Sequence, residues 1–273
     1  MKTYPVDRLR NVGLFSHGGA GKTSLTEAML FATRAISRMG RVEDGTTVSD
    51  WDPDEHRRGI SISTSVIPIE WREHKLNILD APGYFDFLGE VKAALRVSDA
   101  ALILMDASAG VEVGTEQMWS YAAEAGLPRA LLINKLDREN ANFAASLSRA
   151  QEIFGTSVVP VQMPIGQEKD FRGLVDLVSG QAYLFGSNGD LQPADLPAEL
   201  ADTVETYRTQ LVERVCECDD DLMVRYLEGE ALEVEELKAG IRTAFARGDL
   251  TPVFVSAATS LKGVVSLLDA IVD

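Results

Sequence analysis

Cysteine and positive charge are both scarce in this sequence. Only two cysteines occur among its 273 residues, Cys216 and Cys218, in a C-x-C spacing. Cysteines so close together rarely bridge each other, and no second cysteine pair is there to complete a zinc site. We therefore expect two reduced thiols, the usual state in the cytosol.

Lysine and arginine total 26 against 42 aspartates and glutamates, a formal net charge of −16. This balance argues against a broad surface for the phosphates of DNA or RNA, although it leaves room for a local basic patch. Apolar runs of the roughly 18 residues that a membrane span needs are missing, and "MKTYPVDRLR" lacks a signal-peptide core. We expect a cytoplasmic monomer with neither DNA nor membrane as a partner.

What the sequence does contain is 45% hydrophobic residues, enough for a full core. Its apolar runs are short, as in parallel strands covered on both faces, and they alternate with segments of helical spacing. This predicts an α/β fold with a doubly wound, mostly parallel sheet, and the glycine-rich stretch "SHGGAGKTS" at the end of the first run makes it one of the P-loop NTPase type. The expected strands lie at 11–15, 62–71, 74–81, 100–107, 129–137 and 251–260, and the expected helices at 22–36, 113–126 and 263–273.

The alternation of apolar runs and helical segments is interrupted between about residues 158 and 250. Short strands at 157–165 and 173–185 lead to a loop rich in Pro and Asp, and then to helices rich in Glu and Asp. We expect a nucleotide-binding core made of 1–157 and 251–273, with 158–250 as an inserted α+β subdomain. The acidic helices either dock a basic partner or form an ordinary solvated face.

The stretch "SHGGAGKTS" at 16–24 is almost the phosphate-binding loop G-x-x-x-x-G-K-(S/T), with Ser16 in place of the first glycine. Such a loop offers backbone N–H donors at a helix N-terminus, a lysine for the β and γ phosphates and a hydroxyl for magnesium. A strand before it and a helix after it favour this function over a turn that merely caps a helix. The expected phosphate contacts are Gly18, Gly19, Ala20, Gly21, Lys22, Thr23 and Ser24.

A second motif, "NKLD" at 134–137, follows an apolar strand directly. The Asp137 carboxylate can accept both the N1–H and the 2-amino hydrogens of guanine, which adenine does not offer together. Lys135 would lie along the base, and Asn134 would tie this loop to the phosphate loop. In "SAA" at 256–258, on the last expected strand, Ser256 and Ala257 complete the base site, with the Ala257 N–H directed at guanine O6.

Two further segments fit a nucleotide-dependent switch. "DAPG" closes a strand as D-x-x-G, so that Asp80 would hold magnesium through water and the Gly83 N–H would contact the γ-phosphate. Residues 40–60 are predicted to form a long polar loop, and Ser61 just after it would add a second hydroxyl to the metal. Loops ordered by γ-phosphate and released on hydrolysis make a switch. The expected metal ligands are therefore Thr23, Ser61 and Asp80.

Taken in this order, the motifs resemble the GTP-binding domain of bacterial elongation factor G. The likeness is greatest to the elongation-factor-G-like group, whose phosphate loop reads H-G-G-(A/S)-G-K-T, and it extends to "MPIG", "FRGLVDLV" and "RYLEGE" in the insertion. The resemblance implies GTP or GDP with Mg²⁺ as ligands and GTP hydrolysis on the ribosome. It also implies that the insertion meets the ribosomal stalk protein, that the switch face meets a large-subunit RNA loop, and that further domains follow Asp273.

The sequence departs from the family pattern at positions that bear on catalysis. Tyr84 stands where the family has a histidine that orients the attacking water, and a phenol cannot become an imidazolium. Gly18 and Gly19 replace an isoleucine of a hydrophobic gate and an aspartate. A GTPase using Lys22, Gly83 and Tyr84 thus competes with a GTP-dependent ribosome-binding switch of little turnover. An ATPase is disfavoured by Asp137.

Overall fold

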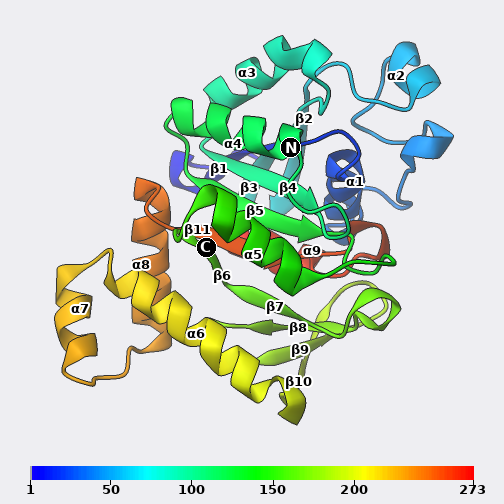
Figure 1. Cartoon of the computed structure of the whole chain (residues 1–273). Helices are drawn as coiled ribbons and strands as arrows, with labels where there is room; N and C mark the ends of the chain where they lie inside the picture. Colours follow the sequence, from blue (N-terminus) through cyan, green and yellow to red (C-terminus); the bar gives the residue numbers. More distant parts are fainter. Residues whose placement is uncertain (1) are drawn as a thin grey trace.

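The computed structural model describes residues 2–273, which form a seven-stranded sheet, a four-stranded sheet and the helices around them (Figure 1). All neighbours in the larger sheet are parallel except β2, which forms a hairpin with β3. The predicted doubly wound, mostly parallel sheet is confirmed. In spatial order its strands are β2 (Ser65–Trp71), β3 (His74–Asp80), β1 (Leu9–Ser16), β4 (Ala100–Asp106), β5 (Arg129–Asn134), β11 (Thr251–Val255) and β6 (Val158–Pro160).

Helices cover both faces of this sheet. Helices α1 (Lys22–Ala32) and α9 (Val264–Val272) pack on one face, and α3 (Leu88–Val97), α4 (Val113–Glu124) and α5 (Phe143–Phe154) on the other. Successive residues of β4 show the division, because Leu104 joins the cluster around α1 and α9 while Ile103 and Met105 join the cluster around α5. Strands buried on both faces need apolar residues at every position, which explains the uninterrupted runs in the sequence.

The inserted segment forms an antiparallel sheet and a helical layer. The strands are β7 (Gln162–Ile165), β8 (Gly173–Asp176), β9 (Ala182–Phe185) and β10 (Leu191–Ala194), and the helices are α6 (Ala201–Cys216), α7 (Asp220–Leu227) and α8 (Val234–Arg247). The single strand expected at 157–165 is in fact two strands in different sheets. Because β6 pairs with β11, residues 158–160 lie in the main sheet, although the predicted division assigned them to the insertion.

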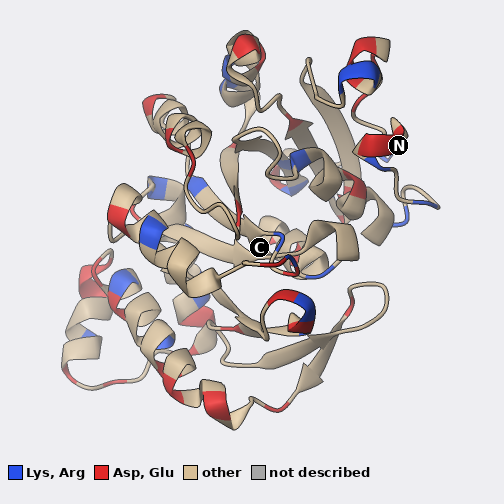
Figure 2. Ribbon diagram, turned by 45° about the vertical axis from the view of Figure 1, so that its right-hand side comes forward, with Lys and Arg blue, Asp and Glu red and all other residues tan. Residues whose placement is uncertain are grey.

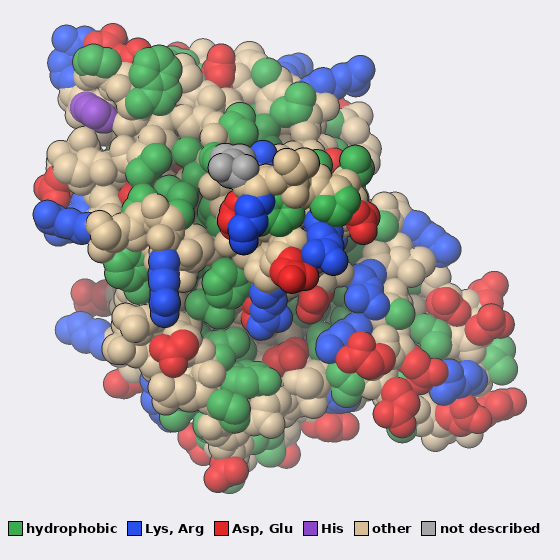
Figure 3. Space-filling view, turned by 180° about the vertical axis from the view of Figure 1, so that it is seen from behind, with side chains coloured by type: hydrophobic (Ala, Val, Ile, Leu, Met, Phe, Trp, Pro, Cys, Tyr) green, Lys and Arg blue, Asp and Glu red, His purple; other side chains and the backbone are tan. Residues whose placement is uncertain are grey.

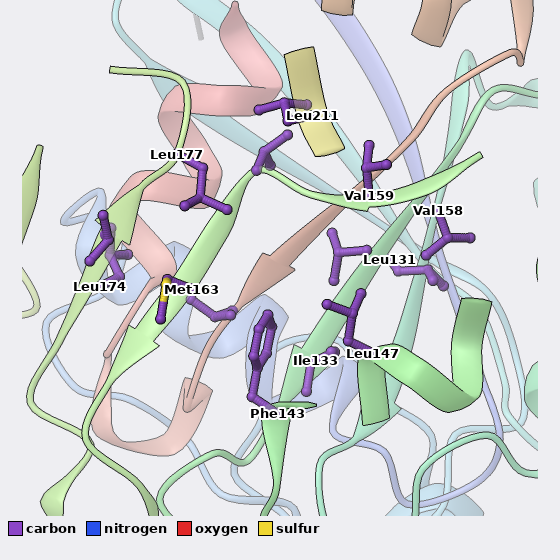
Figure 4. Close-up of a cluster of buried hydrophobic side chains, with 14 of the residues drawn as sticks. Leu131, Ile133, Phe143, Leu147, Val158, Val159, Met163, Leu174, Leu177 and Leu211 are labelled. Atoms are coloured by element: carbon purple, nitrogen blue, oxygen red, sulfur yellow. The ribbon is translucent and has the colours of Figure 1, made fainter. Parts of the chain in front are cut away.

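One apolar core joins the insertion to the nucleotide-binding part. Figure 4 shows Ile133 of β5 and Phe143 of α5 in the same cluster as Met163, Leu174 and Leu211 from the inserted segment. All of these side chains are buried. The insertion is therefore packed onto the core as a continuation of it, so that its position is fixed by side-chain packing and not by its two chain connections alone.

The polar segment 40–60, predicted as a loop, contains a short helix, α2 (Pro53–Arg58), and a 3-10 turn (Val42–Asp44). The Asp52 side chain caps α2 by accepting the Asp54 N–H at 2.7 Å, Pro53 occupies the first helical position, and Gly59 ends it at φ 64°. These are the ordinary start and stop signals of a helix. The segment was expected to be a loop because its polar composition lacks the apolar spacing of a helix.

Charge is unevenly distributed over the surface. In Figure 2 acidic residues recur along the inserted helices, but several are paired, as Arg225 is with Glu230 and Glu236. Figure 3, seen from behind the view of Figure 1, shows Lys and Arg side chains interspersed with acidic ones. Both cysteines are free thiols. Among residues 2–273, no helix combines the length and apolar content that crossing a membrane requires.

Candidate nucleotide-binding site

A cavity of about 330 Å³ opens at the carboxyl ends of the parallel strands, where loops from several strands meet. This edge is where ligands bind in open α/β sheets. Most of the predicted phosphate, metal and catalytic residues line it together. The lining is Gly18, Gly19, Gly21, Lys22, Thr23, Ser24, Val42, Glu43, Asp50, Gly59, Ile60, Ser61, Gly83, Tyr84, Asn134, Lys135, Arg138, Ala258 and Thr259.

The phosphate loop turns from β1 into α1 through glycines with left-handed backbone. Gly19 has φ 85° and Gly21 has φ 101°, conformations that a residue with a Cβ rarely adopts. A Cβ on Gly21 would also lie 2.7 Å from Nδ2 of Asn134, so the base loop could not approach. The loop thus leads into the N-terminus of an eleven-residue helix, whose free N–H groups attract anions.

Two opposite charges are buried at the floor of this loop. Lys22 is buried, and its Nζ donates to Ser16 Oγ at 2.8 Å. Burial lowers the pKa of the Lys22 ammonium to about 8, although the attraction of Asp80 opposes this. Burial likewise raises the pKa of Asp80 to about 6, against the pull of Lys22. Within residues 2–273, neither carboxylate oxygen of Asp80 makes a hydrogen bond of ordinary length, although the nearby hydroxyls of Thr23 and Ser49 oppose the rise of its pKa.

Hydroxyl oxygens stand at the cavity wall beside this carboxylate. Thr23 Oγ1 lies 3.2 Å from Ser61 Oγ, and Ser61 donates to Asp50 Oδ1 at 2.7 Å. Burial raises the pKa of Asp50, an acid that the sequence did not single out. Carboxylate and hydroxyl oxygens are the donors that Mg²⁺ takes in nucleotide sites. The donor set and the unpartnered Asp80 carboxylate therefore fit a magnesium ion.

A buried carboxylate holds the segment that carries Ser61. The two oxygens of Glu55 accept four backbone N–H groups: those of Trp51 and Asp52 at 3.0 Å, Ile62 at 2.9 Å and Ser63 at 3.1 Å. Residues on both sides of α2 are thereby joined at one point. Sequence reasoning missed Glu55, although its place three residues after Asp52 is that of a capping box.

A second buried carboxylate ties the same segment to α1. Glu27 accepts the N–H of Gly40 at 2.8 Å and that of Val48 at 2.6 Å. A fully buried glutamate is rare unless its charge is compensated, and here two backbone amides supply the compensation. No local pattern in the sequence distinguishes Glu27 from an ordinary helix-surface glutamate.

The loops expected to bind the base are joined through one amide side chain. Asn134 Nδ2 donates to the Ala20 carbonyl at 3.0 Å, which is the expected tie to the phosphate loop. Its Oδ1 accepts from Ser256 Oγ at 2.9 Å and from the Ala258 N–H at 3.1 Å. Every polar atom of this buried side chain is thus used before any ligand binds.

The lysine and the aspartate of "NKLD" have different hydrogen-bond partners in the structure. Lys135, in left-handed conformation at φ 63°, donates from Nζ to the Gly19 carbonyl at 2.6 Å and to Asp106 Oδ2 at 2.7 Å. Asp106, which sequence reasoning missed, has a lowered pKa because its bonds to Lys135 and Ser108 outweigh burial. Asp137 is half-buried and accepts from Ser260 Oγ at 2.8 Å.

The expected contact between the Ala257 amide and guanine O6 is not available in this structure. The Ala257 N–H donates to the Lys262 carbonyl at 2.9 Å, and Ser256 and Ala257 are both fully buried. Ala258 and Thr259 line the cavity in their place. The hydrogen bond that closes this turn could not be read from the three residues of "SAA".

A larger hollow of about 700 Å³ lies at the opposite edge of the sheet. Its lining is mainly apolar, with Tyr183, Phe245 and Phe254, and the amino ends of the strands border it at Ala100 and Pro252. It lacks the glycine-rich turn, the buried lysine and the pair of hydroxyls from Thr23 and Ser61. The residues that line the smaller cavity therefore make it the candidate nucleotide site.

Fold and site together define a P-loop GTPase with an inserted subdomain. A family model described as "Elongation factor Tu GTP binding domain" matches residues 7–273. A crystal structure of a protein from Thermus thermophilus matches with a TM-score of 0.92 at 39% identity, over 97% of this chain and 40% of that one. The chain belongs to the elongation factor Tu GTP-binding domain family, which consists of translational GTPases, and it spans 40% of the length of the Thermus protein.

Proposed function

We propose that the chain binds GTP and GDP with Mg²⁺ and hydrolyses GTP on the ribosome, as a factor of the elongation-factor-G-like type. The observation that carries the proposal is the buried pair of Lys22 and Asp80 beside the cavity, of which the carboxylate makes no hydrogen bond of ordinary length. Lys22 and the hydroxyls of Thr23 and Ser61 line the cavity, and a magnesium-bound phosphate chain would give all four groups polar partners.

In this proposal hydrolysis is an in-line attack of water on the γ-phosphate, with no protein group acting as a strong base. Lys22 neutralises charge on the β and γ phosphates, and the Gly83 N–H holds a γ oxygen. The Tyr84 hydroxyl orients the attacking water by a hydrogen bond. Thr23 and Ser61 would hold Mg²⁺ directly and Asp80 would hold it through water, and the ion would supply further charge neutralisation.

Guanine selectivity would come from Asp137, with Lys135 along the base. We further propose that the factor acts as a monomer in the cytoplasm. The inserted segment would meet the ribosomal stalk protein and the switch face a large-subunit RNA loop. These partners rest on the resemblance to elongation factor G, and the rigid attachment of the insertion to the core supports a role in docking.

A second candidate function is a GTP-dependent ribosome-binding switch with little turnover. Tyr84 favours it, because a phenol holds water but does not supply the cationic donor that an imidazolium would. The two functions predict the same nucleotide affinity and the same metal site. They differ only in the rate of the chemical step.

Single-turnover hydrolysis of labelled GTP, with and without ribosomes, separates the two functions. Ribosome-dependent acceleration supports the GTPase. Tight GTP binding without acceleration supports the switch, and acceleration on changing Tyr84→His would then identify the phenol as the cause. Preferential binding of ATP in competition would overturn both.

A further inference from the structure

Gly18 is the one phosphate-loop glycine whose conformation does not require glycine. Gly19 and Gly21 have positive φ, whereas the Gly18 backbone does not lie in the left-handed region. A side chain at position 18 would nevertheless collide. A Cβ built there would lie 2.9 Å from Cζ of the Tyr84 ring, 3.1 Å from Cε2 and 3.2 Å from Cε1. The ring of Tyr84 therefore lies directly over Gly18.

The residue before Tyr84 packs on the phosphate loop in the same way. A Cβ on Gly83 would lie 2.6 Å from Lys22 Nζ and 3.0 Å from the Gly18 Cα. Immediately after it, the Tyr84 carbonyl accepts the Phe87 N–H at 3.1 Å and starts a 3-10 turn. The backbone around Tyr84 is thus fixed from both sides, and the ring has its place over Gly18 without strain in the main chain.

The Tyr84 side chain is 44% exposed and borders the cavity at its phosphate end. Because it is exposed at the cavity wall, its hydroxyl can reach a water or a phosphate oxygen. From the sequence alone, Gly18 and Tyr84 are two separate departures from the family pattern: Gly18 replaces a gate side chain and Tyr84 replaces a histidine. In the structure these two residues are in contact with each other.

We propose that Gly18 and Tyr84 are a matched pair, in which the missing side chain at 18 lets the Tyr84 ring lie over the phosphate loop beside the γ-phosphate. Gly18 is then a positioning residue that acts through Tyr84. The inference rests on the proposed function, and it adds that the aromatic ring takes the place of the absent gate side chain. A methyl group at position 18 displaces a half-exposed ring, so it alters the site without unfolding the chain.

A double-mutant cycle with Gly18→Ala and Tyr84→Ala tests the pair in the full chain. With Tyr84 present, Gly18→Ala should lower the ribosome-stimulated single-turnover rate by about tenfold, a coupling expected of residues in contact. In the Tyr84→Ala background the same change should have less than about a twofold effect. Gly89→Ala is the matched control, because a Cβ there meets nothing within 4 Å. Additive effects, or no effect of Gly18→Ala, would overturn the proposal.

A second readout keeps the pair testable if the chain hydrolyses no GTP at all. The ¹⁹F signal of 3-fluorotyrosine at position 84, assigned by its loss in Tyr84→Phe, reports the surroundings of the ring in the nucleotide-free chain. Gly18→Ala should shift this signal and Gly89→Ala should leave it in place. A shift without hydrolysis would uphold the pair and refute the GTPase, whereas hydrolysis with an unshifted signal would refute the pair alone.

Discussion

The two ends of the nucleotide cavity differ in how completely their polar groups are satisfied. At the base end, Asn134 uses its donor and its acceptor within the protein, and Lys135 bonds both Asp106 and the Gly19 carbonyl. At the phosphate end, Asp80 has no hydrogen-bond partner within the described chain, and Lys22 has only the Ser16 hydroxyl. The base end is complete without a ligand, and the phosphate end is not.

The difference assigns separate tasks to the two ends. Buried charges with few hydrogen bonds cost free energy, which a bound ligand recovers, so the phosphate end links stability to nucleotide. A satisfied network stabilises the free protein and presents a preformed surface to the base. Changes at the phosphate end should therefore appear mainly in affinity, and changes at the base end in stability and in base selectivity.

The largest effect is expected at Lys22. Lys22→Ala removes the cation that would contact two phosphates, so the affinity for GDP and GTP should fall by about a thousandfold. Lys135→Ala, at the base end, should lower the unfolding free energy of the nucleotide-free chain by about 1–2 kcal/mol, because two hydrogen bonds to Lys135 are lost. Titration with a fluorescent GDP and urea denaturation measure the two quantities. Equal effects of both variants on stability would contradict the division of tasks.

Base selectivity should be the next most sensitive property. Asp137→Asn removes the charge that accepts two guanine hydrogens, so the preference for GTP over ATP should fall by about a hundredfold. Competition between the two nucleotides measures it. Ser260→Ala is a matched control that deletes only the hydroxyl donating to Asp137, and it should cost about fivefold or less. An unchanged GTP to ATP ratio in Asp137→Asn would show that another group reads the base.

The two ends also differ in how far the sequence predicted them. The motif "NKLD" begins at the end of β5, where its asparagine was expected to reach the phosphate loop that follows β1, and Asn134 does bond the Ala20 carbonyl. The contact of Tyr84 with Gly18 joins two motifs, and neither motif alone contains it. Glu27 lies outside every motif. Any carboxylate that the fold brings close can bind a backbone amide, so no sequence pattern marks this contact.

The fold could be predicted where apolar runs mark buried parallel strands. It could not be predicted where a single apolar run contributes strands to two different sheets. The residues 157–165 read as a single strand, but tertiary pairing divides them between β6 and β7. The helix α2 was missed because five of its six residues are polar or charged and give it no apolar face, so that only Asp52, Pro53 and Gly59 mark it.

A third prediction concerns the carboxylate that holds the first switch segment. Glu55→Gln leaves one side-chain acceptor oxygen for four backbone N–H groups, so Ser61 should lose its fixed position beside Thr23. The Mg²⁺ affinity of the GTP complex should fall by about tenfold, with the GDP complex changed by less than about twofold. Magnesium titrations measure both, and hydrogen exchange at Ile62 and Ser63 should become faster. Glu73→Gln, at an exposed ion pair with Arg8, is the control, and an equal loss in both complexes would contradict a switch-specific role.

The smallest effect is expected at Ser16, where the phosphate loop departs from its usual glycine. The Ser16 hydroxyl holds Lys22 at 2.8 Å in the free protein, and in the proposed complex the phosphates take its place. Ser16→Ala and Ser16→Gly should therefore raise the affinity for GDP by about threefold, because they destabilise the free state more than the bound one. The alanine variant separates the lost hydrogen bond from the added flexibility of glycine. A fall in affinity in both variants would mean that Ser16 orients Lys22 toward the phosphates, and the phosphate end would then be partly preformed, as the base end is.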